Sequence, residues 1–389
     1  MKKTLQFILL FVCMISCSEG IRDVSDSMSL VPAEDFLEYE IDSDSEVPIF
    51  NLYTFEDNGT EYLTFSNRHS RTILIYELLS GKFVKKVEFA GEGPNGIGQW
   101  LYGYLMTDFN HIYVPSAHKE TIFLTDTTGV FKDKIIYSYT EDSLNTLRAY
   151  YNNIDNVQLT FIGDSLYIPQ SLNNSLGEDR WIKESPVSVV VDMNNGKVTR
   201  FPMNHPPLLP GRDVRKTLEG GVAYSQVYNG KDFVYSFTMD EKLYQVNPQT
   251  GNYETFPVKS RYLPELKFRK SPEDFAQVLK KNCETAHYGN IFYDKFRKVY
   301  YRFACPETEL GANLNYLKIL HTGKKEFSIM ILDEEFNILG ETKFPAFTYV
   351  PHICFIREDG LYISTSHFMR EDYSDDLLRF QRIELVKNK

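Results

Sequence analysis

The sequence predicts an all-β protein, a β-propeller of about six four-stranded blades closed into one ring. Aromatic residues make up 14% of the 389 residues, which favours a strand-rich fold with a substantial core. A unit of strand, polar loop, strand, tight turn and strand also recurs along the whole chain. Because one such unit cannot bury both of its faces alone, we expect the copies to stack around a ring.

The first copy shows the unit most clearly. Its apolar strand at residues 73–77 is followed by the turn Ser80-Gly81, a second strand at 83–89 and a glycine-rich connector at 91–98. The six copies cover residues 61–89, 111–137, 165–201, 232–256, 298–344 and 360–386. The five turns that can be compared hold Gly81, Gly129, Gly196, Gly251 and Asn337, all residues that tolerate the left-handed conformation.

The last copy ends after its third strand, because only three residues follow Val386. The early apolar stretch Phe36–Ile41 predicts a strand that supplies the missing fourth strand and closes the ring. Two long segments, 138–164 and 257–297, contain no copy and leave a seventh blade open as an alternative.

Two interruptions of the strand pattern predict short helices that decorate the rim. In the first, at 271–281, Ser271 is the expected N-cap and Pro272 the first helical residue. The second, at 142–151, rests on the spacing of Leu144 and Leu147.

Residues 1–16 have the organisation of a signal peptide, with two lysines, an apolar run and the small residue Ser16. The end of this segment, Met14-Ile15-Ser16-Cys17, resembles a bacterial lipobox, which makes Cys17 the expected lipidation site; an ordinary secretory signal is the alternative. The apolar run from Leu5 to Ile15 is too short to span a bilayer, so the lipid would be the only membrane anchor.

The sequence therefore predicts three parts: the signal peptide, a Ser/Asp-rich flexible tether at 17–34 and a single propeller domain at 35–389. The expected location is the cell envelope, with the protein anchored to the outer membrane on its periplasmic side or at the cell surface. The expected partners are the membrane, through the lipid on Cys17, and a protein or glycan that the sequence does not identify.

Charge and motifs exclude several classes of function. Without residues 1–16 the chain keeps 40 basic and 53 acidic residues, a formal charge of −13, which disfavours nucleic acid as a partner. No metal or cofactor motif is present, and Cys283, Cys305 and Cys354 lack ligand spacing, so we predict no metal and no cofactor. These cysteines form at most one disulfide or remain buried thiols. The glycines at 91–96 are followed by no lysine and include Pro94, which argues against a phosphate-binding loop.

The loops of the unit predict where a ligand would bind. With strands a to d in each blade, the b–c loops and the d–a connectors emerge on the same side of a propeller, here called the loop face. Loops on a rigid scaffold are where binding residues concentrate. The candidate ligand-binding residues on this face are Arg68, His69, His118, Lys119, Arg180, Trp181, His367 and Arg370. For each of them, hydrogen bonding within the loops or packing is the alternative.

One junction carries a resemblance to a known family. Residues 81–100, GKFVKKVEFAGEGPNGIGQW, resemble the blade junction of NHL-type six-bladed propellers, although Asn95 interrupts the Gly-Pro-Gly run of that motif. Together with the lipobox, the tyrosine-rich repeats are similar to a Bacteroidetes family of propeller lipoproteins with no established activity. The resemblance implies a six-bladed fold and an exported, lipid-anchored protein.

These observations favour a non-catalytic lipoprotein that binds a ligand or scaffolds a partner through its loop face. The alternative is a hydrolase or lyase that acts on glycan or peptide at the channel mouth, with His69, His118 or His367 as base. A sensor or assembly partner that is active only within a complex is a third hypothesis.

Overall fold

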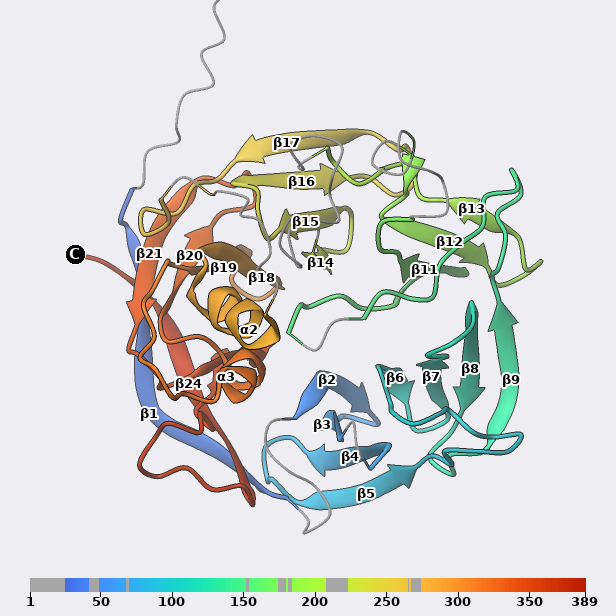
Figure 1. Cartoon of the computed structure of the whole chain (residues 1–389), viewed down its shortest axis with the longest axis horizontal. Helices are drawn as coiled ribbons and strands as arrows, with labels where there is room; N and C mark the ends of the chain where they lie inside the picture. The colour runs from blue at the N-terminus through green and yellow to red at the C-terminus, as the bar shows by residue number, and fades with distance from the viewer. Residues whose placement is uncertain are drawn as a thin grey trace, which may run out of the picture.

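The described strands form six antiparallel four-stranded sheets that follow one another around a ring (Figure 1). This computed structural model describes residues 25–41, 49–67, 70–151, 154–173, 180, 184–207, 223–264, 266 and 274–389. The predicted β-propeller is confirmed with six blades, and no seventh sheet occurs in the described parts of 138–164 and 257–297.

Each blade runs from an inner strand to an outer strand, and the first five blades use consecutive strands. Blade 1 contains β2 (Phe50–Asp57), β3 (Thr60–Asn67), β4 (Thr72–Glu77) and β5 (Phe83–Glu88), and blade 2 contains β6 (Leu105–Asp108), β7 (His111–Pro115), β8 (Thr121–Thr125) and β9 (Phe131–Ile136). Blade 3 contains β10 (Thr160–Ile162), β11 (Ser165–Pro169), β12 (Ser188–Asp192) and β13 (Val198–Arg200), and blade 4 contains β14 (Tyr224–Tyr228), β15 (Phe233–Phe237), β16 (Lys242–Val246) and β17 (Tyr253–Pro257). Blade 5 contains β18 (His287–Asp294), β19 (Val299–Cys305), β20 (Phe327–Leu332) and β21 (Ile338–Phe344), and blade 6 contains β22 (Val350–Arg357), β23 (Gly360–Ser364), β24 (Leu377–Lys387) and β1 (Met28–Glu40).

Burial explains the composition of the strands. The middle strands lie between two neighbouring blades, so both of their faces are covered: every residue of β20 is buried, and so are all but one of β4. The outer strand β5 is mostly exposed. Each pair of adjacent blades encloses its own apolar cluster; Tyr39, Phe65 and Phe380, for example, pack together between blades 6 and 1.

The N-terminal strand closes the ring, as the sequence predicts. β1 pairs antiparallel with β24, from Met28 opposite Lys387 to Glu40 opposite Leu377, with a bulge between Pro32 and Phe36. β1 begins at Met28, so the last part of the segment expected as a tether belongs to blade 6. Its side chains are largely exposed there, with Leu30 as a buried exception, which is why the apolar pattern begins only at Phe36.

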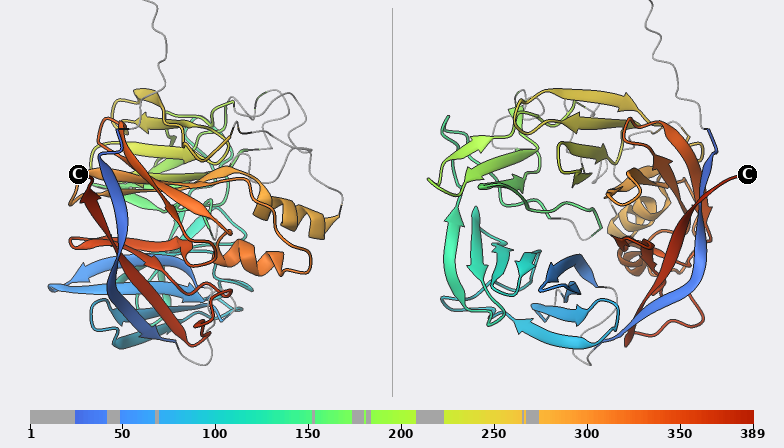
Figure 2. Two further views of the ribbon diagram at one scale, coloured as in Figure 1. Left: turned by 90° about the vertical axis from the view of Figure 1, so that its left-hand side faces the viewer. Right: turned by 180° about the vertical axis from the view of Figure 1, so that it is seen from behind.

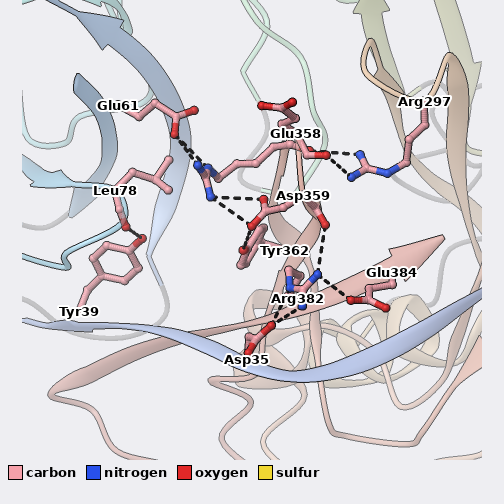
Figure 3. A network of polar contacts seen from close by, with 11 residues as sticks. Asp35, Tyr39, Glu61, Leu78, Arg297, Glu358, Asp359, Tyr362, Arg382 and Glu384 are labelled. Atoms are coloured by element: carbon pink, nitrogen blue, oxygen red, sulfur yellow. Dashed lines mark hydrogen bonds and ion pairs between the residues drawn. The ribbon is translucent and has the colours of Figure 1, made fainter. Parts of the chain in front are cut away.

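Ion pairs reinforce the seam on the side of the ring opposite the loop face (Figure 3). The guanidinium of Arg357, in blade 6, lies 2.7 Å from the Glu61 carboxylate of blade 1 and 3.3 Å from Asp359. Arg382 pairs with Glu384 at 2.6 Å and with Asp35 of the closing strand β1. Each of the two arginines therefore contacts two carboxylates; Arg357 joins blade 6 to blade 1, and Arg382 joins the closing strand to the rest of blade 6.

A buried arginine joins blades 4 and 5. Arg302 on β19 has no exposed surface, and its guanidinium lies 3.5 Å from the centre of the Tyr288 ring. It donates hydrogen bonds to Ser236 Oγ at 3.0 Å and to backbone carbonyl oxygens at 2.6–2.8 Å on the loop-face segments of blade 4: those of Asp240, Glu241 and Val258. Burial lowers the pKa of Arg302 to about 10, although the nearby groups Asp240, Glu241 and Glu341 act in the opposite direction.

Two helices lie on the loop face. α2 (Phe275–Glu284) matches the first predicted helix; Asp274 caps it by accepting from Gln277 N at 2.9 Å, whereas the expected cap Ser271 and Pro272 lie outside the described residues. α3 (Tyr316–Thr322) was not predicted, because its seven residues are too few to show a helical period. Within the described residues, no helix combines the length and apolarity needed to cross a bilayer.

The predicted helix at 142–151 is wrong, because this segment is irregular. Ser143 has a φ of +65°, which breaks a right-handed helix at its first turn. The rest of the segment bonds instead to blade 3: Leu147 N donates to Gln170 Oε1 at 2.6 Å, and Tyr150 N donates to Pro169 O at 2.8 Å. Tertiary partners thus replace the helical hydrogen bonds that the leucine spacing suggests.

Candidate functional site

The b–c loops and the d–a connectors lie together in space, as predicted. In blade 1, the b–c loop residue Arg71 donates to Phe89 O at 3.4 Å and to Gln99 O at 3.2 Å, both on the connector to blade 2. A side chain at Gly98 would meet His118 Nε2 at 3.2 Å, which places the next b–c loop against the same connector. The glycine-rich connector is therefore a packed link between loops.

The candidate ligand-binding residues that the structure describes lie on the loops of three different blades. Arg68, His69 and Trp181 lie outside the described residues. His118 and Lys119 are exposed on the b–c loop of blade 2. Arg180 is exposed and pairs with Glu184 at 2.6 Å. Whether any of them binds a ligand stays a prediction.

His367 and Arg370 on the b–c loop of blade 6 both have partners, and His367 also contacts the b–c loop of blade 5. His367 has no exposed surface; its Nε2 lies 3.2 Å from Gly323 O, and its Nδ1 accepts from Met369 N at 3.2 Å. Burial lowers the pKa of His367 to about 4, so the ring is neutral with both nitrogens in use. Arg370 binds the Asp372 carboxylate at 2.7 Å. This geometry disfavours His367 as a general base.

The centre of the ring contains two connected hollows. A lower cavity of about 270 Å³ is lined by the inner strands β2, β14, β18 and β22 and by the segment Ile154–Gln158. A smaller upper chamber of about 60 Å³ lies toward the loop face, under the end of α3. Both are bounded by Ile154, Asp155 and His352. In Figure 1, the green segment that precedes β10 reaches toward the middle of the ring.

Asn156 holds this central segment in place. Its backbone nitrogen donates to Asn290 Oδ1 at 2.7 Å, and its side-chain Nδ2 donates to Ile291 O at 3.2 Å. Its carbonyl oxygen accepts from Gln226 N at 2.9 Å. One residue thus ties the segment to the inner strands of blades 4 and 5.

The upper chamber holds a buried amine. Lys324, just after α3, donates from Nζ to Thr285 O at 3.0 Å and approaches His287 Nδ1 at 2.9 Å. His287 Nδ1 also lies 3.2 Å from Thr285 O, so the amine, the ring nitrogen and the carbonyl oxygen form one buried polar cluster. None of the described carboxylates forms an ion pair with Lys324, and burial lowers its pKa to about 8.

The thiols beside this amine remain protonated near neutral pH. The three cysteines are free and buried, so of the two predicted alternatives the structure has buried thiols and no disulfide among them: Cys283, Cys305 and Cys354. Burial raises the pKa of Cys283 and of Cys305 to about 11, although the Lys324 charge acts in the opposite direction. Burial also lowers the pKa of His287 to about 3. Lys324 is therefore the group of this cluster that titrates just above neutrality.

We expect the burial of Lys324 to make stability depend on pH. The unfolded amine has an ordinary pKa near 10.4, so between about pH 8 and pH 10 the unfolded state binds more protons than the folded state, and stability rises with pH. Relative to Lys324→Met, the wild-type free energy of unfolding should increase by about 2 kcal/mol from pH 7 to pH 9.5. Urea unfolding at both pH values measures this, with the exposed Lys295→Met as control. A pH-independent difference between wild type and Lys324→Met would contradict the expectation.

Comparison with known proteins identifies the family. The model of the domain of unknown function DUF4221 matches residues 27–343. The chain belongs to the DUF4221 family. A DUF4221 member from Bacteroides vulgatus ATCC 8482 superimposes with a TM-score of 0.80 at 23% identity, over 94% of this chain and 100% of that one. A predicted exported protein from Bacteroides fragilis NCTC 9343 superimposes with a TM-score of 0.50 at 11% identity, over 92% and 96% of the two chains. None of the curated proteins matches the chain.

These comparisons confirm the predicted Bacteroidetes propeller family and its fold. The DUF4221 model spans β1 and the first five blades, so the closing strand lies within the family's own boundary. At 23% identity, the Bacteroides vulgatus structure supports the fold alone.

The loop face of this DUF4221 chain exposes apolar side chains on its helices. α2 and α3 pack together and project from one side of the ring (Figure 2, left). Phe275 on α2 is 70% exposed, Leu317 on α3 is 47% exposed and Met369 on the b–c loop of blade 6 is 41% exposed. These three residues are called the helix patch below. In the part of the chain that the structure describes, no three His, Cys, Asp or Glu side chains gather as a metal ion would require.

Proposed function

We propose that this DUF4221 protein is a non-catalytic binding protein of the cell envelope that holds a protein partner on its helix patch. The single observation that carries the proposal is the exposure of Phe275, Leu317 and Met369 on the loop face. Large apolar side chains that are exposed on one side of a soluble domain favour a protein interface. A glycan would favour a polar cleft instead.

The helices that carry the patch are held rigidly, as a binding surface requires. Between them lies a small apolar cluster of Cys283, Leu310 and Ile319. Cys283 Sγ also lies 3.3 Å from Tyr316 O, which ties α2 to α3. Nearby, Lys318 Nζ lies 5.3 Å from the centre of the Phe368 ring, so α3 also contacts the b–c loop of blade 6.

Site-specific photo-crosslinking tests the proposal. A photoreactive phenylalanine replaces Phe275 or Leu317 in the full-length protein, which is irradiated in its native membranes. Tyr253, on the outer strand β17 of blade 4, is 55% exposed and serves as a matched control away from the patch. We expect a discrete protein adduct from positions 275 and 317 but none from position 253. The same adducts from all three positions, or none from the patch, would overturn the proposal, and release of an adduct by glycosidase would favour a glycan partner.

We further propose that the protein is attached to the outer membrane by a lipid on Cys17. The support is the lipobox-like sequence Met14-Ile15-Ser16-Cys17. We expect the mass of the mature wild-type protein to include acyl chains and the protein to sediment with membranes. Cys17→Ala should lose both properties, and unchanged sedimentation of this variant would contradict the anchor.

A further inference from the structure

The upper chamber is a small, partly open hollow with a primary amine in its lining. Lys324 lines the chamber together with His287, Asn290, Cys305, Asp155 and His352. Part of the Lys324 surface remains accessible, whereas Nζ is held by Thr285 O and His287 Nδ1 at 3.0 and 2.9 Å. The chamber thus combines access for a small molecule with an amine whose position is fixed.

The surroundings of Lys324 favour its neutral, nucleophilic form. An ammonium group that is buried without a carboxylate partner is costly, so the amine loses its proton more readily than a surface lysine does. The pKa of Lys324 falls to about 8 through burial. A neutral amine has a free lone pair, which is the requirement for addition to a carbonyl carbon.

A second group in the chamber lacks a partner. His352 Nε2 is buried and has no hydrogen-bond partner among the described residues. A buried polar atom without a partner is costly unless a ligand or water binds it. His352 lines both the upper chamber and the lower cavity.

We propose that Lys324 reversibly captures a small uncharged aldehyde in the upper chamber as an imine. The volume of about 60 Å³ restricts the ligand to a short chain of about one to three carbons. Lys324 is the one lysine or arginine among the lining residues, and Asp155 is also present, so a carboxylate on the ligand would find no second cation.

The reaction balances without any oxidant or reductant. The Nζ lone pair of the neutral amine adds to the aldehyde carbon, and a proton moves from nitrogen to the former carbonyl oxygen, which gives a carbinolamine. The second proton on the nitrogen then moves to this hydroxyl group, so that it leaves as water. The carbon–oxygen bond then breaks, water departs, and the carbon–nitrogen double bond forms; the reverse reaction consumes one water. The Cys305 thiol, whose pKa burial raises to about 11, stays protonated and does not compete for the aldehyde.

Reductive trapping tests this inference on the full-length protein at pH 8. The protein is incubated with glycolaldehyde and cyanoborohydride, and the adducts are located by peptide mass spectrometry. We expect Lys324 to be labelled at least about tenfold faster than the exposed Lys295, because a larger fraction of its amines is neutral. Lys324→Met should remove the fast phase, whereas Lys295→Met should keep it.

The design remains decisive if Lys324→Met destabilises the fold, because the ratio of labelling rates is measured within the wild-type protein. Equal labelling of Lys324 and Lys295 would overturn the proposal. Faster labelling by glyoxylate than by glycolaldehyde would overturn the preference for an uncharged ligand. The inference does not depend on the helix patch: failure of crosslinking at position 317 leaves the labelling ratio unaffected.

Discussion

Replacing Arg302 with methionine should lower the free energy of unfolding by about 3–5 kcal/mol, which is a large fraction of the stability of most domains. Methionine fills part of the space but donates no hydrogen bond. The carbonyl oxygens of Asp240, Glu241 and Val258 would then be left without their donor at the interface of blades 4 and 5. The Tyr288 ring would also lose the guanidinium that lies 3.5 Å from its centre.

Equilibrium unfolding in urea measures this loss. Arg382→Met is the matched control, because the Arg382 side chain is 21% exposed and its ion pairs with Glu384 and Asp35 lie at the surface. We expect this control substitution to lower the free energy of unfolding by no more than about 1 kcal/mol. An Arg302→Met protein within 1 kcal/mol of the wild type would show that the buried arginine does not hold the two blades together.

Removing residues 1–40 should abolish cooperative folding, since the deletion takes away the outer strand of blade 6. Without β1, β24 becomes an open edge and the cluster between blades 6 and 1 loses Tyr39. The hydroxyl of Tyr39, which donates to Leu78 O of blade 1 at 2.6 Å, is lost as well. A ring that cannot close leaves the apolar faces of two blades exposed to water.

Circular dichroism during heating and limited proteolysis measure the effect. The control lacks only residues 1–24 and should unfold at the same temperature as the protein without its signal peptide. Tyr39→Ala is a milder change than the deletion. This variant should still fold, with a free energy of unfolding lowered by about 3–5 kcal/mol. A sharp and unshifted transition in the protein that lacks residues 1–40 would contradict the role of β1 in closure.

The repeated unit was predictable because its signals are local. The turn glycines Gly81, Gly129, Gly196 and Gly251 all have positive φ. Their positions in tight turns between strands predicted this conformation. The closing strand at Phe36–Ile41 followed from counting strands. The predicted helix at 142–151 failed because hydrogen bonds to Gln170 and Pro169 override its local propensity. The resemblance of residues 81–100 to NHL-type junctions stays a prediction.

The interior site was not predictable from local patterns. Lys324 and His287 are 37 residues apart and meet because blade 5 folds its b–c loop over its inner strand. Asn156 and Asn290 are 134 residues apart and meet because the ring brings blades 3 and 5 to its centre. In the sequence, Lys324 stands beside Lys325 in a run that looks like an ordinary solvated turn. The ligand-binding site was instead predicted on the loop face, because histidines and arginines are frequent in those loops.

The way in which the ring closes also determines how a lipid anchor would orient the molecule. Met28 lies opposite Lys387, and the preceding Ser25 N donates to Ile338 O, beside the turn between strands c and d of blade 5; this is the side of the ring opposite α2 and α3. Ten residues separate Cys17 from Met28, so the eleven steps between their Cα atoms span at most about 40 Å. With the proposed lipid on Cys17, the molecule would stand close to the bilayer with its helices pointing outward. A partner would then approach from the aqueous compartment, and the mouth of the upper chamber would open away from the lipid surface.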